Sequence, residues 1–212
     1  KQKSFDYPET RKVDTVDDYF GTLVADPYRW LEDDTSQETA AWVEAQNKVT
    51  FEYIGNIPFR DDIRNRLENL WNYPRMGVPN REGDYYFYSY NDGLQNQDVI
   101  YIKQSLDEEG QVFLDPNTFS DDGTVALTNF TVSNNHRYVG YGISRGGSDW
   151  REFFVKEIKN GQVLDDHLRW IKFSDISWFK DGFFYNRFNK PEKGNELKGV
   201  NENSKLYYHR VG

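Results

Sequence analysis

A unit of strand, polar turn and aromatic strand recurs in the second part of the chain. Copies begin at Val132 and Trp178, 46 residues apart, and a fainter copy begins at Val78, 54 residues before the first of these. Each copy is followed by a further hairpin, which is the pattern of a four-stranded propeller blade. A closed propeller needs about four to eight blades. We therefore expect a ring of which this chain supplies only two to three blades.

The strands of these units are short and rich in aromatic and β-branched residues, the composition that favours a half-buried pleated surface. Residues that tolerate positive φ in tight turns separate the strands, at Asn91-Asp92-Gly93, Glu109-Gly110, Asn160-Gly161 and Asp181-Gly182. The sequence predicts strands over 85–90, 99–103, 138–143, 153–158, 183–188 and 206–211.

Before residue 75 the apolar period is that of helices. Trp42, Ala45, Val49 and Tyr53 follow one another at spacings of three and four, which predicts a helix over 36–54 with Thr35 or Ser36 as its cap. A second helix is predicted over 58–71, with Pro58 in its first turn and Pro74 after its end. Each helix has one apolar stripe, and two helices of this length cannot bury both stripes on each other. They need a partner surface.

Composition excludes several classes of protein. The net charge of −9 and a pI near 4.9 argue against nucleic acid as a partner. No apolar run exceeds four residues, so no segment can span a membrane. The chain has no Cys, and hence neither a disulfide framework nor a thiolate metal site. Aromatic residues make up 17% of the chain and supply the core area that aliphatic residues lack.

Gly142-Ile143-Ser144-Arg145-Gly146 satisfies the G-x-S-x-G pattern of a hydrolase nucleophile. That motif requires a turn from strand to helix, and here a glycine-rich turn and another strand follow. Asp175 and His209 complete the order Ser, Asp, His, but spacing alone does not bring them together. We predict that Ser144 lies in a hairpin connection and that His209 lies in a strand.

Cofactor and metal sites have little support. His136, His167 and His209 form no H-x-x-x-H pair, the acidic pairs lack the alternation of a calcium loop, and no phosphate-binding glycine motif occurs. We expect no metal and no cofactor.

Several longer strings are specific enough to indicate a family. The chain resembles the opening of prolyl oligopeptidases, the proline-specific serine peptidases, over essentially all 212 residues. The matching strings are Tyr7-Pro8, Val16-Asp17-Asp18-Tyr19-Phe20-Gly21, Asp26-Pro27-Tyr28-Arg29-Trp30-Leu31-Glu32-Asp33, Trp42-Val43-Glu44-Ala45-Gln46-Asn47, Asp121-Asp122-Gly123-Thr124-Val125-Ala126-Leu127, Gly147-Ser148-Asp149-Trp150 and Lys205-Leu206-Tyr207-Tyr208-His209.

The resemblance implies a fold and an activity. Residues 1–74 would be a helical segment that packs on an α/β-hydrolase domain, and 75–212 would be the first two to three blades of a seven-bladed propeller. The complete enzyme would cleave short peptides after proline, with the propeller controlling access. Its serine, aspartate and histidine would lie in the hydrolase domain, beyond this chain. We therefore expect an N-terminal fragment with no catalytic residue of its own and a cytoplasmic location, with the periplasm left open.

The resemblance also implies two substrate-binding residues. Phe173 matches an aromatic residue of the apolar peptide pocket, and Asp149 matches an aspartate that pairs with a substrate-orienting arginine of the hydrolase domain. Their structural alternatives are a blade-core aromatic and a loop-capping aspartate.

The implied partners are short proline-containing peptides, the hydrolase domain and the remaining blades, with neither nucleic acid nor membrane among them. A second hypothesis is a complete β-rich binding module, without catalysis, that recognises a peptide or protein.

Overall fold

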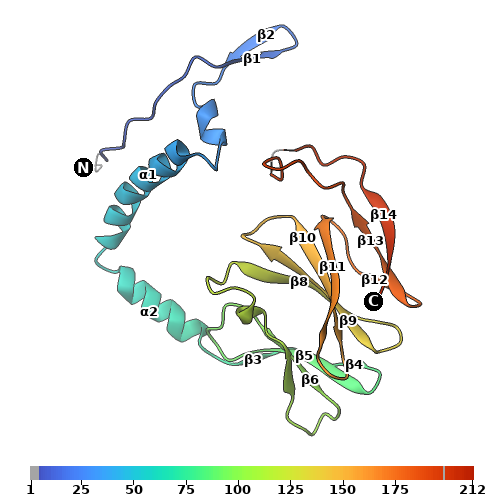
Figure 1. Ribbon diagram of the computed structural model, residues 1–212. Helices are drawn as coiled ribbons and strands as arrows, with labels where there is room; N and C mark the ends of the chain where they lie inside the picture. The colour runs from blue at the N-terminus through green and yellow to red at the C-terminus, as the bar shows by residue number, and fades with distance from the viewer. Residues whose placement is uncertain (1–4, 198) are drawn as a thin grey trace. The chain divides into compact units, whose positions relative to one another are not determined.

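The computed structural model describes residues 5–197 and 199–212. The chain forms two compact units, Lys1–Leu70 and Trp71–Gly212. The first contains the helices, and the second contains most of the β-structure (Figure 1). The predicted class, mainly β with N-terminal helices, is confirmed. No helix among the described residues has the length and apolar character needed to cross a membrane.

Both predicted helices form, as α1 (Gln37–Gly55) and α2 (Arg60–Trp71). Ser36 caps α1, because its hydroxyl accepts a hydrogen bond from the backbone N–H of Thr39 at 3.1 Å. The predicted place of Pro58 was wrong by two residues: it lies in the turn before α2. A backbone hydrogen bond closes that turn: the N–H of Arg60 donates to the carbonyl of Ile57 at 3.1 Å.

A small hairpin that the sequence patterns did not predict precedes the helices. Its strands, β1 (Val16–Tyr19) and β2 (Thr22–Ala25), pair in antiparallel register around Phe20 and Gly21. Both turn residues have positive φ, 56° and 89°, which matches the right-handed twist of a two-residue hairpin. Arg29, in the short 3-10 helix η1 (Arg29–Glu32), forms ion pairs with Asp17 and Asp26 and ties the hairpin to the following turn.

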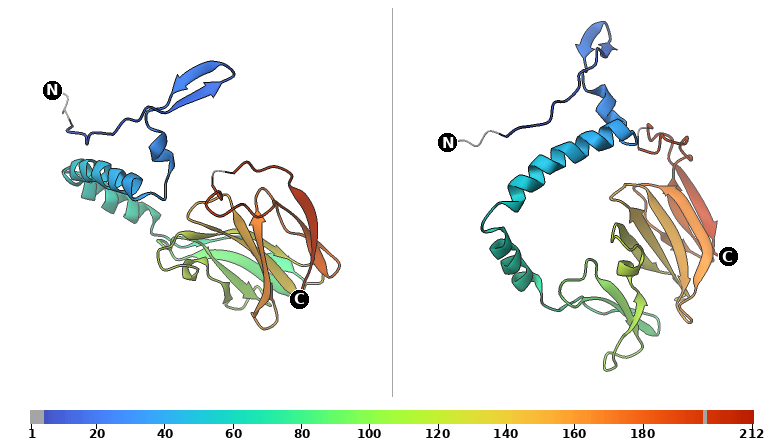
Figure 2. Two further views of the ribbon diagram at one scale, coloured as in Figure 1. Left: turned by 45° about the horizontal axis from the view of Figure 1, so that its top comes forward. Right: turned by 60° about the vertical axis from the view of Figure 1, so that its left-hand side comes forward.

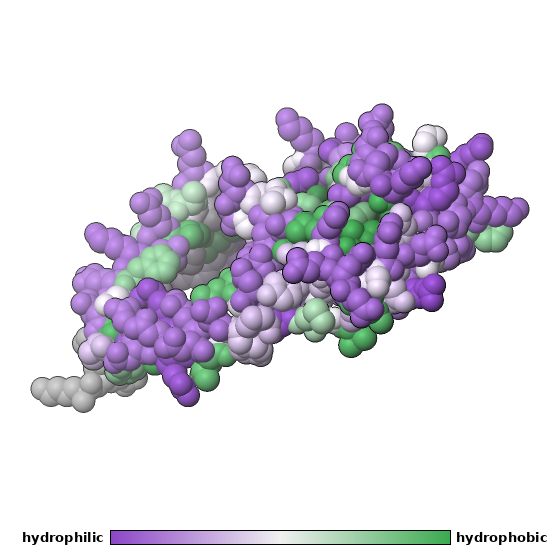
Figure 3. Space-filling view, turned by 90° about the horizontal axis from the view of Figure 1, so that it is seen from below, coloured by the Kyte–Doolittle hydropathy of each residue, from purple (hydrophilic) through white to green (hydrophobic). Residues whose placement is uncertain are grey.

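The apolar stripes of the helices are exposed. Every residue of α2 is exposed, including Ile63, Leu67 and Leu70 on its apolar face, and Phe51 of α1 is exposed as well. Hydrophobic side chains, green in Figure 3, reach the molecular surface on the face seen there. The expectation that these stripes need a partner surface agrees with this exposure, because two helices of this kind are marginal without tertiary packing.

The second unit consists of three antiparallel sheets that follow one another in chain order (Figure 2). In the second sheet, each strand pairs with its neighbour in sequence, as in a propeller blade. The first sheet is β3 (Arg75–Met76), β4 (Asn80–Glu82), β5 (Tyr85–Asn91), β6 (Val99–Lys103) and β7 (Gln111–Leu114); the second is β8 (Val125–Val132), β9 (Tyr138–Arg145), β10 (Arg151–Glu157) and β11 (Val163–Ile171); the third is β12 (Ser177–Phe179), β13 (Gly182–Arg187) and β14 (Lys205–Arg210).

Two apolar clusters hold the sheets together. Val139 of β9 packs in a cluster with Phe87 of the first sheet, whereas Phe153 of β10 packs in a second cluster with Phe183 of the third sheet. Gly140 of β9 allows Ile176, a member of the second cluster, to pack closely against the second sheet, because a Cβ at Gly140 would lie 2.9 Å from the side chain of Ile176. The second sheet is therefore covered on both faces.

All six predicted strands are confirmed, and β6 agrees with its prediction at both ends. The strands that were missed, such as β8 and β11, contain polar residues, and register shifts interrupt their alternation.

The expectation that Gly182 is needed for a positive φ was wrong. In that turn the positive φ, 52°, belongs to Lys180, whereas Gly182 is needed because a Cβ would lie 2.0 Å from the carbonyl oxygen of His209.

Candidate substrate-binding site

Strand pairing brings Asp149 and Phe173 to the same end of the second sheet. Arg151, the first residue of β10, pairs with Ile171, the last residue of β11. Asp149 and Phe173 each lie two residues beyond this pair. The two residues that the resemblance indicated, 24 positions apart in sequence, therefore occupy adjacent loops.

Phe173 is an exposed aromatic residue on a strained backbone. Its side chain is 77% exposed, and its φ is 52°. Trp170, three residues earlier, has a φ of 65°. A bulky residue rarely adopts positive φ, and such strain costs on the order of 1–3 kcal/mol. Phe173 belongs to neither apolar cluster, so its exposure argues against the blade-core alternative.

Residues on both sides of Phe173 are anchored. Lys172 is only 8% exposed, and its Nζ lies 4.0 Å from the centroid of the Trp150 ring. Ser174 accepts a hydrogen bond at its carbonyl from Nη1 of Arg151 at 3.4 Å, and at its hydroxyl from the backbone N–H of Asn186 at 2.8 Å. The exposed ring is thus flanked by one buried side chain, Lys172, and by a residue that is hydrogen-bonded to two others.

Asp149 presents its carboxylate to solvent. It follows Gly146 and Gly147, which have φ of 57° and 72°, in the connection between β9 and β10. The hydroxyl that caps this loop is that of Ser148, which accepts from the N–H of Trp150 at 3.2 Å. Within the described residues, the Asp149 carboxylate makes no hydrogen bond, and it is available to a cation.

The structure does not bring Ser144, Asp175 and His209 together. The prediction that Ser144 lies in the hairpin connection was wrong, because β9 extends to Arg145 and Ser144 pairs there with Arg151; a turn and strand β10 follow it, rather than a helix. Asp175 accepts a hydrogen bond from Nδ2 of Asn129 at 2.7 Å. His209, in strand β14 as predicted, contacts the buried Asp166 at 2.5 Å. Ser144, Asp175 and His209 thus have different partners and do not form a catalytic triad.

Sequence reasoning missed Lys172 and Arg151, the side chains that anchor the Phe173 loop. The signal for Lys172 was a single lysine inside the apolar run Trp170-Ile171-Lys172-Phe173. Arg151 gave no signal, because its contacts with Ser174 and with Asn129 Oδ1, at 3.3 Å, depend on the folded sheet.

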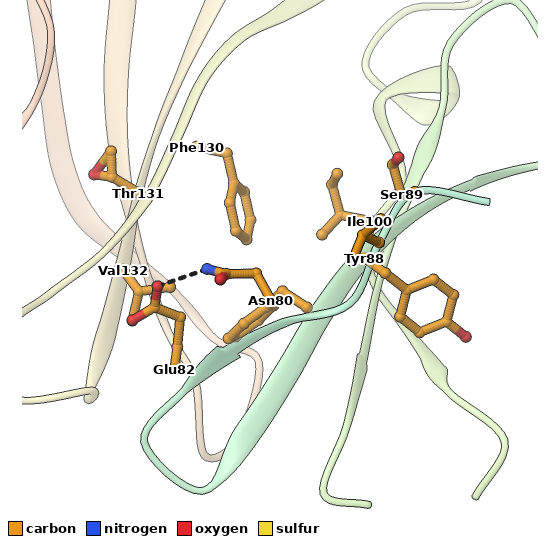
Figure 4. Close-up of a pocket in the computed structure, with 11 residues that line it drawn as sticks. Asn80, Glu82, Tyr88, Ser89, Ile100, Phe130, Thr131 and Val132 are labelled. Atoms are coloured by element: carbon orange, nitrogen blue, oxygen red, sulfur yellow. Dashed lines mark hydrogen bonds between the residues drawn. The ribbon is translucent and has the colours of Figure 1, made fainter. Parts of the chain in front are cut away.

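A cavity of about 420 Å³ lies elsewhere in the second unit (Figure 4). It is lined by Ile100 and Phe130, among other apolar residues, and by Asn80, whose Nδ2 donates to Glu82 at 2.8 Å. Neither Asp149 nor Phe173 lines it. We base the candidate site on the two loops, because they combine an exposed ring, an uncompensated carboxylate and backbone strain.

Comparison with known proteins identifies relatives over the whole chain. The family model described as "Prolyl oligopeptidase, N-terminal beta-propeller domain" matches residues 7–212. The chain is 45% identical over 207 residues to a prolyl endopeptidase of Elizabethkingia meningoseptica, and 44% identical over 210 residues to that of Elizabethkingia miricola. These matches cover 97% and 99% of the chain but only 29% and 30% of the two relatives.

Solved structures give the same picture. A structure from a study of two prolyl endopeptidases matches 97% of the chain and 29% of its own length, with a TM-score of 0.59 and 37% identity. Prolyl oligopeptidase B from Galerina marginata, bound to a 35mer hydrolysis and macrocyclization substrate, matches 98% of the chain and 32% of its own length. Its TM-score is 0.81 at 29% identity.

Proposed function

This chain belongs to the prolyl oligopeptidase family, and from that premise we propose that it is the N-terminal part of a proline-specific serine peptidase. The enzyme would hydrolyse short peptides on the C-terminal side of proline. The observation that carries the proposal is the match of nearly the whole chain to about 30% of the length of prolyl endopeptidases. We place the enzyme in the cytoplasm.

Catalysis would be performed by an α/β-hydrolase domain outside these 212 residues. There a serine attacks the peptide carbonyl, a histidine transfers the proton, and backbone amides stabilise the oxyanion. The exposed stripes of α1 and α2 would pack on that domain. The sheets of the second unit, completed by further blades, would form the ring that admits short peptides and excludes folded proteins by size.

Within this chain, Phe173 would supply one apolar wall for the bound peptide. Asp149 would pair with an arginine of the hydrolase domain that orients the substrate. The exposure of both groups and their position at one end of the second sheet support these roles.

Size selection is tested with the enzyme that contains this chain and the hydrolase domain. We expect rapid cleavage of a proline peptide, and no cleavage of the same sequence within a folded domain. Equal rates for the two substrates would contradict gating by the propeller.

A parallel assay uses the 212-residue chain alone with a fluorogenic proline peptide. We expect no turnover. Turnover that Ser144→Ala abolishes would show that the nucleophile lies in this chain, against the proposal.

A further inference from the structure

Lys172 is a buried cation that makes no ion pair within the described residues. It is 8% exposed, and its ammonium group lies over the ring of Trp150, with Nζ 4.0 Å from the ring centroid. A buried charge is costly unless another group compensates it. The negative face of the indole provides that compensation, and the attraction strengthens as water is excluded. Trp150 is therefore the main partner that the fold offers to this amine.

Trp150 is itself held in place from several directions. Its Nε1 donates a hydrogen bond to the carbonyl of Glu196 at 2.6 Å. The ring of Trp170 lies edge-on at 5.7 Å, and that of Phe188 at 6.1 Å. Trp170 also accepts a backbone hydrogen bond from Phe188 at 2.9 Å. The indole is thus a fixed surface, and a contact with it determines the position of the lysine.

This contact joins the two loops of the candidate site. Lys172 directly precedes Phe173, and Trp150 directly follows Asp149. We propose that Lys172 is a positioning residue: its ammonium group on Trp150 sets the separation between Phe173 and Asp149, and so holds the peptide-binding ring in register with the carboxylate. The catalytic consequence rests on the proposed function, whereas the coupling of the two loops does not.

Ser174, on the other side of Phe173, should remain anchored when the positive charge of Lys172 is removed. Arg151 and Asn186 still bind Ser174 when Lys172 is changed. The strands are unaffected, because Phe153 and Ile171 remain buried between the sheets. Loss of the ammonium group should therefore loosen both loops without unfolding the sheet.

The coupling is tested on the 212-residue chain by hydrogen exchange of segments 146–151 and 170–175. In Lys172→Met we expect exchange in both segments to rise about tenfold, in line with the strength of a desolvated cation–π contact. Lys172→Arg, which keeps the charge, should restore slow exchange. Lys156→Met is the matched control: Lys156, in β10 of the second sheet, has its Nζ 4.9 Å from the ring centroid of Phe113, and its loss should leave both segments unchanged.

Faster exchange in 170–175 alone, or in neither segment, would overturn the proposal. If Lys172→Met does not fold, Trp150→Phe serves instead, since phenylalanine attracts a cation less strongly than indole. It should raise exchange in both segments by a smaller factor, and unchanged exchange in this variant would equally count against the coupling.

The catalytic consequence is measured in the enzyme that contains the hydrolase domain. We expect Lys172→Met to raise KM for a proline peptide severalfold while kcat changes less than twofold, with Lys172→Arg near wild type. Unchanged KM in Lys172→Met, in an enzyme where Phe173→Ala raises KM, would refute the positioning role. If Phe173→Ala also leaves KM unchanged, the proposed function of Phe173 is wrong, and the exchange data still decide the coupling.

Discussion

At the level of single residues, strain and burial occur together near the candidate site. Trp170 and Phe173 both have positive φ, and between them lie the fully buried Ile171 and the nearly buried Lys172. Strained backbone persists where the surrounding packing over-determines it. The buried pair supplies that packing on the N-terminal side of Phe173, next to the exposed ring.

Gly182 shows a second effect at this scale, in which a single atom decides whether two strands can pair. We expect Gly182→Ala to destabilise the chain by about 2–3 kcal/mol, because its Cβ would overlap the backbone of His209 and a strand cannot move aside as a side chain can. Denaturant unfolding measures the change.

The comparison variant for this prediction is Gly146→Ala. Gly146 has positive φ, and a Cβ added there would have no atom within 4 Å, so only the cost of the left-handed conformation, about 1–2 kcal/mol, applies. A larger loss in Gly146→Ala than in Gly182→Ala would contradict the steric explanation.

At the level of strands, Glu152 of β10 connects the two strands that flank it in the second sheet, β9 and β11. Its carboxylate accepts from Nε of Arg145 in β9 at 2.9 Å and contacts Nε2 of His167 in β11 at 2.6 Å. Burial acts to raise the pKa of Glu152, but the hydrogen bonds from Arg145 and His167 outweigh it and hold the pKa below its ordinary value of 4.5.

The sign of the pH effect follows from this lowered pKa. Folding favours the ionised carboxylate, so Glu152 contributes stability above pH 4.5, and that contribution is lost as the pH falls through the lower folded-state pKa. We expect Glu152→Gln to be less stable than wild type at about pH 7 and the difference to shrink toward about pH 3 in urea unfolding. A difference that grows on acidification would show that the pair does not act in this way. Glu109→Gln, in an exposed turn, is the control.

At the level of the whole molecule, the exposed stripe of α2 distinguishes this chain from the enzyme in which we place it. Leu67→Gln should change the unfolding free energy of the 212-residue chain by less than about 0.5 kcal/mol, since Leu67 is already exposed. In the enzyme with its hydrolase domain, the same substitution should cost about 1–2 kcal/mol, because the side chain would then be covered.

Asn65→Gln, on the opposite face of the same helix, should have little effect in either protein. Thermal or denaturant unfolding of both proteins makes the comparison. Equal effects of Leu67→Gln in the two would mean that the hydrolase domain does not cover α2.

Local patterns were sufficient for much of the fold. The helical period over 36–54 and the aromatic strands from 85 onward correspond to α1, β5 and β6 within one residue at each end, because side chains three or four apart, or two apart, share a face whatever the rest of the chain does. The repeat likewise indicated successive blades, and longer strings indicated the family to which the chain belongs.

Features that depend on how the strands pair could be obtained only from the tertiary structure. The pairing of Arg151 with Ile171 places Asp149 beside the Phe173 loop, and the overlap between Gly182 and His209 arises from strands far apart in sequence. Bulges shift such pairings by one residue, which moves a side chain to the other face of the sheet. The contact of Lys172 with Trp150 therefore could not be read from residue types, because it exists only where two loops meet at one end of a sheet.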